Sequence, residues 1–246
     1  MKRILLLFFI TITAVFTHAQ TTYYWVGGKD AAPQNISLLT NWNTLLDGTG
    51  SPRASSTGAT DILIFDGANY GGSTLTTGTD SVNMNSGITC GQLKFINSAK
   101  VIFTRGTSGT STLTIVGDGA PATEDFLIET GCSASLSNGA GSQVIVMGGT
   151  NNSGRVSGDF RMVTGLQARI ANGTSAGTTL VFTAGSTFTT NITSGSAAYA
   201  FGTNSQSTEK WVTFQAGSTL YYDGGFSPMG SSATFQPVTF QQGSSF

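Results

Sequence analysis

Residues 180–188 read L-V-F-T-A-G-S-T-F, and the same pattern returns as V-T-F-Q-A-G-S-T-L at 212–220 and V-T-F-Q-Q-G-S-S-F at 238–246. We call this pattern the corner motif: two apolar residues with one residue between them, two spacers, Gly-Ser-hydroxyl, and another apolar residue. Looser copies lie at 126–134, where cysteine replaces the serine, and at 93–101, where serine replaces the glycine. Recurrence at intervals of ~20–50 residues is typical of solenoids and arrays.

The corner motif predicts two strands joined by a sharp bend. Apolar residues two positions apart point to the same face of a strand. Glycine tolerates positive φ, and neighbouring hydroxyls can bond to nearby backbone, so the Gly-Ser step predicts the bend. One such unit cannot bury its apolar face alone, so copies must stack. At ~25 residues per coil we expect eight or nine coils, and a β-sandwich is the alternative all-β fold.

The first residues, 1–19, are typical of a secretory signal peptide. Lys2 and Arg3 precede a mostly apolar run over 4–16, and in Thr17-His18-Ala19 the small residues Thr17 and Ala19 lie three positions and one position before the expected cleavage site. The apolar run is short for a bilayer span, which needs ~20 residues. We therefore expect cleavage near Ala19 and a secreted or outer-surface location.

Composition excludes several classes of function. Charged residues make up 9 % of the chain, and the single histidine, His18, belongs to the expected signal peptide. A mature chain without histidine cannot form a Ser-His-Asp or Cys-His catalytic group. It is also slightly acidic and has no basic run, which argues against a nucleic-acid partner, and it contains no nucleotide-binding P-loop. Hydrophobic residues at 39 % favour a packed core over disorder.

The opening block, residues 20–70, carries Y-Y-W-V-G-G at 23–28, N-W-N at 41–43 and D-I-L-I-F-D at 61–66. This order resembles the amino-terminal unit of large secreted surface proteins of Bacteroidota, many of them autotransporter-like or adhesin-like and exported by the type IX system. The resemblance implies a right-handed parallel β-helix, with an aromatic cap over its first coils and repeats over 71–246. Those proteins continue much further and end in a sorting domain, so we expect this sequence to be a fragment of a larger protein.

Two cysteines and four acidic residues are candidates for chemistry. Cys90 and Cys132 either form a disulfide, which a secreted chain permits, or pack as buried thiols, and buried packing is favoured. The acidic cluster of Asp118, Glu124, Asp125 and Glu129 offers oxygen ligands for calcium. Its spacing matches no EF-hand loop, so a solvated loop is favoured.

Asp61 and Asp66 flank an apolar strand. At ~3.3 Å per residue they lie about 16 Å apart, too far for the paired carboxylates of a glycoside hydrolase. They are interpreted as strand-terminal residues.

Arg155, Arg161 and Arg169 are the basic residues that an anionic-sugar groove would need. They are not clustered in sequence, and Asp159 is the expected ion-pair partner among them. Catalysis by this set is not predicted.

Tyr221 and Tyr222 are the candidate glycan contacts. Adjacent residues on a strand point to opposite faces, so one of the two rings must face outward, where it can stack on a sugar. No catalytic, metal-binding or cofactor-binding residue is predicted.

The function expected from these observations is that of a non-enzymatic, adhesin-like β-helical stalk or scaffold. Its partners would be surface glycans or receptors on host or neighbouring cells. An exposed last coil would also permit end-to-end self-association. The alternatives are a polysaccharide-active β-helix, either a lyase or a hydrolase, and a carbohydrate-binding module.

Overall fold

A computed structural model gives the structure of the chain. It describes residues 20–27, 34–68, 81–120, 123–164, 168–173, 177–193, 199–202, 210–225, 227–228 and 237–246. The expected signal peptide (1–19) lies outside these ranges. The described part contains no helix long and apolar enough to cross a membrane.

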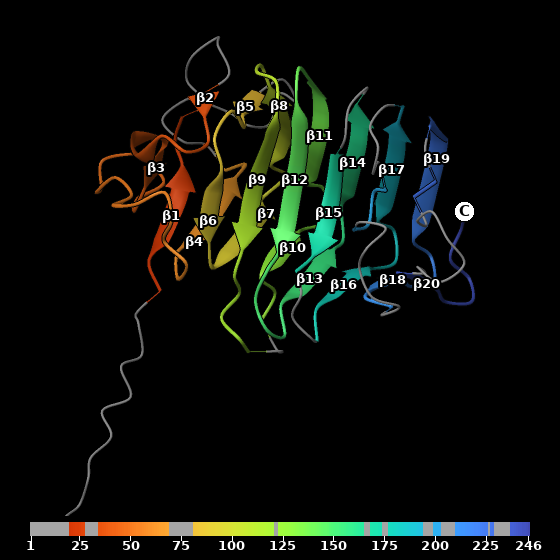
Figure 1. Ribbon diagram of the computed structural model, residues 1–246. Helices are drawn as coiled ribbons and strands as arrows, with labels where there is room; N and C mark the ends of the chain where they lie inside the picture. Colours follow the sequence, from red (N-terminus) through yellow and green to blue (C-terminus); the bar gives the residue numbers. More distant parts are fainter. Residues whose placement is uncertain are drawn as a thin grey trace, which may run out of the picture.

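The part of the chain that the structure describes is all-β, with 51 % of its residues in strands, and its parallel sheets form a β-solenoid of about five turns. Figure 1 shows the strands stacked side by side, from β1 and β3 at one end to β19 and β20 at the other. The predicted parallel β-helix is therefore confirmed. The β-sandwich alternative is wrong, because sandwich sheets are antiparallel.

Three sheets, named A, B and C here, form the sides of the solenoid. In spatial order, sheet A consists of β3 (Trp42–Asn43), β1 (Thr22–Trp25), β4 (Ile62–Asp66), β7 (Gln92–Ile96), β10 (Phe126–Ile128), β13 (Ser153–Val156), β16 (Thr179–Phe182), β18 (Val212–Phe214) and β20 (Val238–Phe240). Sheet B consists of β2 (Gln34–Asn35), β5 (Ser81–Asn83), β8 (Lys100–Arg105), β11 (Ser133–Gly139), β14 (Asp159–Thr164), β17 (Thr187–Ile192) and β19 (Thr219–Gly225). Sheet C consists of β6 (Ile88–Cys90), β9 (Thr110–Ile115), β12 (Ser142–Met147) and β15 (Ala168–Asn172).

The corner motif forms the bend between sheets A and B, as predicted. Gly185 and Gly217 have φ values of 81° and 79°, in the left-handed region that glycine enters without strain. Ser98, which replaces the glycine in the upstream copy, adopts φ 63° at the same place. The Gly185 N–H donates to the Gly217 carbonyl oxygen over 2.8 Å, so successive corners are also bonded to one another.

One coil of the solenoid lacks the corner motif and was not predicted from the repeat. It lies between the copies at 126–134 and 180–188, where β13 and β14 occupy sheets A and B. In this coil Gly154 pairs with Leu180 and therefore replaces the first apolar residue of the corner motif. Its bend is shorter and passes through Gly158, where a Cβ would lie 2.2 Å from the Cys132 carbonyl oxygen. Only glycine fits there without a shift of the neighbouring backbone.

Aromatic rings fill the interior from turn to turn. The Phe182 and Phe214 rings are stacked with centroids 4.4 Å apart, and the Phe214 and Phe240 rings follow at 5.0 Å. Near the other end, Phe65 stacks on Phe95 at 5.2 Å. Such pairs add about 0.5–1.5 kcal/mol each beyond the burial of their area. The core is thus a stack whose members contact mainly the turns above and below.

Tryptophans close the amino-terminal end. Trp25 and Trp42 are buried, with ring centroids 5.1 Å apart, and both contact Phe65. The Trp42 Nε1–H donates to the Ile36 carbonyl oxygen over 2.8 Å. The antiparallel strand β3 covers the outer edge of β1. The aromatic packing expected of Trp25 and Trp42 is therefore present.

Candidate functional site

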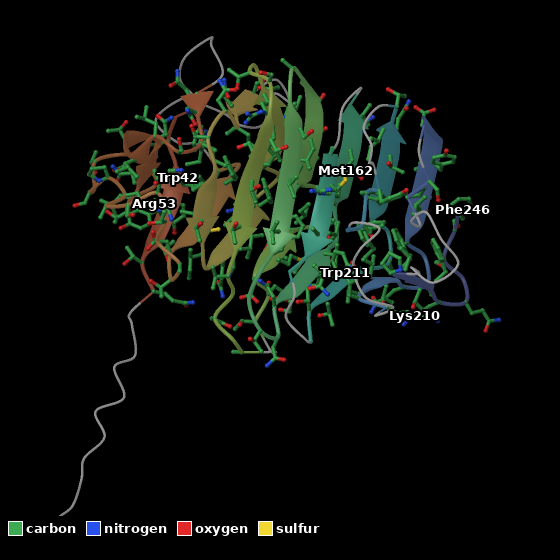
Figure 2. The ribbon with its side chains drawn as sticks, viewed as in Figure 1. Trp42, Arg53, Met162, Lys210, Trp211 and Phe246 are labelled. Carbon is green, nitrogen blue, oxygen red and sulfur yellow. The ribbon has the colours of Figure 1, made fainter. Side chains whose placement is uncertain are left out.

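Both candidate tyrosines lie exposed on β19. Tyr221 is 58 % exposed and Tyr222 is 43 % exposed. They line a hollow of about 460 Å³, called here the aromatic hollow. Its lining residues are Thr219, Leu220, Tyr221, Tyr222, Ser245 and Phe246. Figure 2 labels Phe246 at this end of the molecule, opposite Trp42 and Arg53.

The exposure of Tyr222 departs from strict strand alternation. Tyr222 pairs with Thr190, which is fully buried, so its register position belongs to the interior. The pairing of β17 with β19 then shifts at a bulge between Thr190 and Ile192, and bulges re-aim side chains. The Tyr222 hydroxyl donates to the Gly225 carbonyl oxygen within the same strand. The prediction that one of the two tyrosines faces outward is confirmed for Tyr221, and Tyr222 is exposed as well.

The aromatic hollow combines ring faces with hydroxyl groups. Tyr221 and Tyr222 supply the rings, and Thr219 and Ser245, joined by a parallel bridge, supply hydroxyls at its edge. Exposed rings pack against the apolar faces of ligands, while hydroxyls donate and accept hydrogen bonds. Among the residues that the structure describes, no charged side chain lines the hollow. Its chemistry therefore suits a neutral ligand with both apolar and hydroxyl faces.

The three arginines of the β13–β15 turn point from three different sheets. Arg155 lies on β13 in sheet A, Arg161 on β14 in sheet B and Arg169 on β15 in sheet C. They do not form one groove. The Arg155 Nε lies 2.8 Å from a Glu124 carboxylate oxygen, so the expected partner Asp159 was wrong. Glu124 belongs to the preceding turn, so the sequence does not show that it lies next to Arg155.

Asp61 and Asp66 have separate structural roles. Asp66 ends β4, and its carboxylate accepts from the Ala68 N–H over 2.8 Å and from Asn97 Nδ2 over 2.9 Å. The Asp61 carboxylate lies 2.7 Å from Nε of Arg53, whose side chain is completely buried. Arg53 also donates to the carbonyl oxygen of Thr89, so it ties the loop before β4 to sheet C. Arg53 was not predicted as a buried ion-pair residue, because it lies outside the repeat.

The acidic cluster is divided by the structure. Glu124 pairs with Arg155, and Glu129 follows the far end of β10. Asp118 and Asp125 lie together, because an Asp125 carboxylate oxygen accepts from the Asp118 N–H over 3.2 Å. Asp125 is fully buried, so the expected solvated loop is wrong for this residue. Within the described ranges, no three His, Cys, Asp or Glu side chains gather.

Both cysteines are free and buried, and the favoured interpretation of them is confirmed. Cys132 lies at an A–B corner in the serine position of the corner motif, whereas Cys90 ends β6 in sheet C. Burial raises the pKa of the Cys90 thiol to about 12 and also raises that of Cys132. Both thiols are therefore protonated at neutral pH, and they pack as small apolar groups.

Comparisons with protein-family models, curated proteins and solved structures found no match to the chain. Arguments about function therefore rest on the solenoid and its surface groups.

Proposed function

We propose that this chain is a secreted or surface-displayed, adhesin-like β-helical scaffold that binds neutral glycans at the aromatic hollow and carries no catalytic centre. The observation that carries the proposal is the pair Tyr221 and Tyr222, residues that are 58 % and 43 % exposed beside a hollow whose described lining residues carry no charged side chain. Large apolar groups exposed together on a soluble surface commonly mark contact sites.

The surroundings of the tyrosines support a passive role. The turns are filled with stacked phenylalanines, and four of the described acids are held in ion pairs or hydrogen bonds: Asp61, Asp66, Glu124 and Asp125. Arg155, Arg161 and Arg169 point from separate sheets, so they offer no shared site for an acidic sugar. A scaffold that presents one weak contact gains strength by multivalency rather than by a deep pocket.

Secretion is proposed from the sequence. The charged, apolar and small-residue segments of 1–19 fit a signal peptide, and the opening block resembles surface proteins of Bacteroidota. In that setting, glycans on host or neighbouring cells are the available partners.

The test is a glycan array probed with the chain from Gln20 onward and with the variant Tyr221→Ala/Tyr222→Ala. Each stacked ring contributes about 0.5–1.5 kcal/mol, so loss of both should weaken binding roughly 5- to 150-fold. Tyr221→Phe/Tyr222→Phe keeps the rings and should retain most of the binding. Tyr24→Ala, a partly exposed tyrosine on β1 at the opposite end, is the matched control.

Two results would overturn the proposal. Equal binding by the chain and the double alanine variant would remove the aromatic hollow as the contact. Turnover of an acidic or neutral polysaccharide by the purified chain would replace the scaffold with a polysaccharide-active enzyme.

A further inference from the structure

A second polar site lies far along the chain from Tyr221, where the backbone crosses from sheet C to sheet A between β9 and β10. Asp118 and Asp125 lie at the two sides of this crossing. The Asp118 carboxylate accepts from the Ala120 N–H over 2.8 Å and from the Thr123 hydroxyl over 2.6 Å. The Asp125 carboxylate accepts from the backbone N–H groups of Asp118 and Ser153, over 3.2 and 3.0 Å.

The negative charge of this pair is not balanced by a basic side chain. The ion pairs in the described part of the chain, Arg53–Asp61 and Arg155–Glu124, use other acids. The Asp125 side chain is completely buried, and its carboxylate lies beside the Asp118 backbone rather than beside a basic side chain of the described residues. A buried carboxylate beside a second carboxylate is costly unless it is protonated or bound to a cation.

Two buried amide groups add oxygens with no partner. Gln92 is 2 % exposed, and its Nε2 donates to an Asp118 carboxylate oxygen over 3.2 Å, which brings its amide to the pair. Its Oε1 is buried without a hydrogen bond and, by amide geometry, lies about 2.3 Å from that Nε2. Asn152 is completely buried, and its Nδ2 donates to the Ile115 carbonyl oxygen while its Oδ1 is unpartnered.

Gly117 connects Asn152 to the same place. A Cβ on Gly117 would lie 2.8 Å from an Asp125 carboxylate oxygen and 3.4 Å from Cγ of Asn152. The Asp125 carboxylate and the Asn152 amide therefore both lie within 3.4 Å of one point above the Gly117 backbone. Each unpaired buried oxygen costs about 1–3 kcal/mol, so two beside a carboxylate pair call for a ligand that accepts oxygen donors.

We propose that Asp118, Asp125, Gln92 and Asn152 form a calcium-binding site at this corner. All four offer oxygen, and two of them are acidic, which is the ligand set of a hard divalent cation. Zinc is disfavoured because no histidine or thiolate takes part. Calcium is favoured over magnesium because it accepts carboxylate and amide oxygens in irregular arrangements, whereas magnesium demands a near-ideal octahedron and retains water.

The site would join neighbouring turns of the solenoid. Gln92 begins β7, Asp118 and Asp125 lie on the crossing to β10, and Asn152 precedes β13. β7, β10 and β13 are consecutive strands of sheet A. A cation held by all four would cross-link three successive turns, so its binding would stabilise the stack by mass action. This inference is independent of glycan binding at the aromatic hollow.

The test measures the Tm of the chelator-treated chain as CaCl2 is added, and MgCl2 is added in a parallel series. Titration calorimetry then measures calcium binding directly. Extracellular calcium sites bind with Kd of ~0.1–1 mM, and calcium at ten times Kd should raise Tm by about 3–6 °C. Magnesium should give a smaller shift. Asp118→Asn removes the charge of an exposed ligand and should lose the calcium shift and the calorimetric signal.

Asp159→Asn is the matched control, since Asp159 is an exposed acid on sheet B, and it should keep the full response. Absence of a calcium-dependent shift and of heat of binding up to 10 mM would overturn the proposal. An equal response from Asp118→Asn would overturn it as well, because calcium would then bind elsewhere. Neither result would alter the glycan-array outcome, so the two proposals fail separately.

Discussion

Replacement of Phe214 by alanine tests whether the ring stack holds the solenoid together. Phe214 is completely buried, and its ring stacks between those of Phe182 and Phe240, with centroids 4.4 and 5.0 Å away. The tilted ring of Phe188 and the edge-on ring of Phe201 lie further off, at 6.4 and 6.2 Å. Truncation of a buried phenylalanine to alanine costs about 3–5 kcal/mol, and this site has four ring contacts to lose. We expect a loss near the upper end, about 4–5 kcal/mol.

The effect should also be local, because each turn of a solenoid contacts mainly its neighbours. Native-state hydrogen exchange should show lost protection in β18, β19 and β20, with β9 and β12 unchanged. Phe214→Leu keeps most of the volume and should cost about 1–1.5 kcal/mol. Thr213→Ala, on the outward face of the same strand, is the control and should cost less than 1 kcal/mol. Equal loss of protection in β9 and β18 would refute the reasoning, as would a Phe214→Ala cost no larger than that of Thr213→Ala.

Three further predictions concern the loop, the thiols and the corner. Arg53→Met leaves the Asp61 charge without its partner and should lower the free energy of unfolding in urea by about 3–5 kcal/mol. The double variant Arg53→Met/Asp61→Leu removes both charges and should recover most of that stability. An Arg53→Met variant as stable as the parent would contradict the buried ion pair. Because burial raises the pKa of Cys90 to about 12, its thiol should not react with a disulfide reagent at pH 8 until the chain is unfolded, and fast labelling of the native chain would disprove the packing. Gly217, with φ 79°, should accept asparagine at roughly 1 kcal/mol less cost than valine in thermal unfolding, and equal costs would show that the corner relaxes.

The repeated parts of the fold were readable from sequence because each residue of the corner motif has a local physical role. Leu180 and Phe182 face inward by strand alternation, and Gly185 turns the chain through positive φ. The coil of β13 and β14 was not readable, because Gly154 occupies an apolar position and the bend at Gly158 is shorter. A glycine that makes room for the next turn looks like any other glycine in sequence.

Contacts between turns were the least predictable. Arg155 pairs with Glu124 rather than with the nearby Asp159, because the neighbours of a residue in a solenoid come from the turns above and below it. The length of each loop decides which residues meet there. The burial of Asp125 was hidden for the same reason, since its sequence neighbours, Glu124 and Asp118, suggest an exposed acidic loop.

Because β3 covers one edge of β1, the strands of the solenoid can be added only at the other edge of β1. Trp25, Trp42 and β3 close one side of the first turn, whereas the other edge of β1 pairs with β4. Every later strand finds its template in the strand about thirty residues before it. A chain that becomes available amino terminus first can therefore fold turn by turn behind its aromatic cap, and each turn needs only the one already formed.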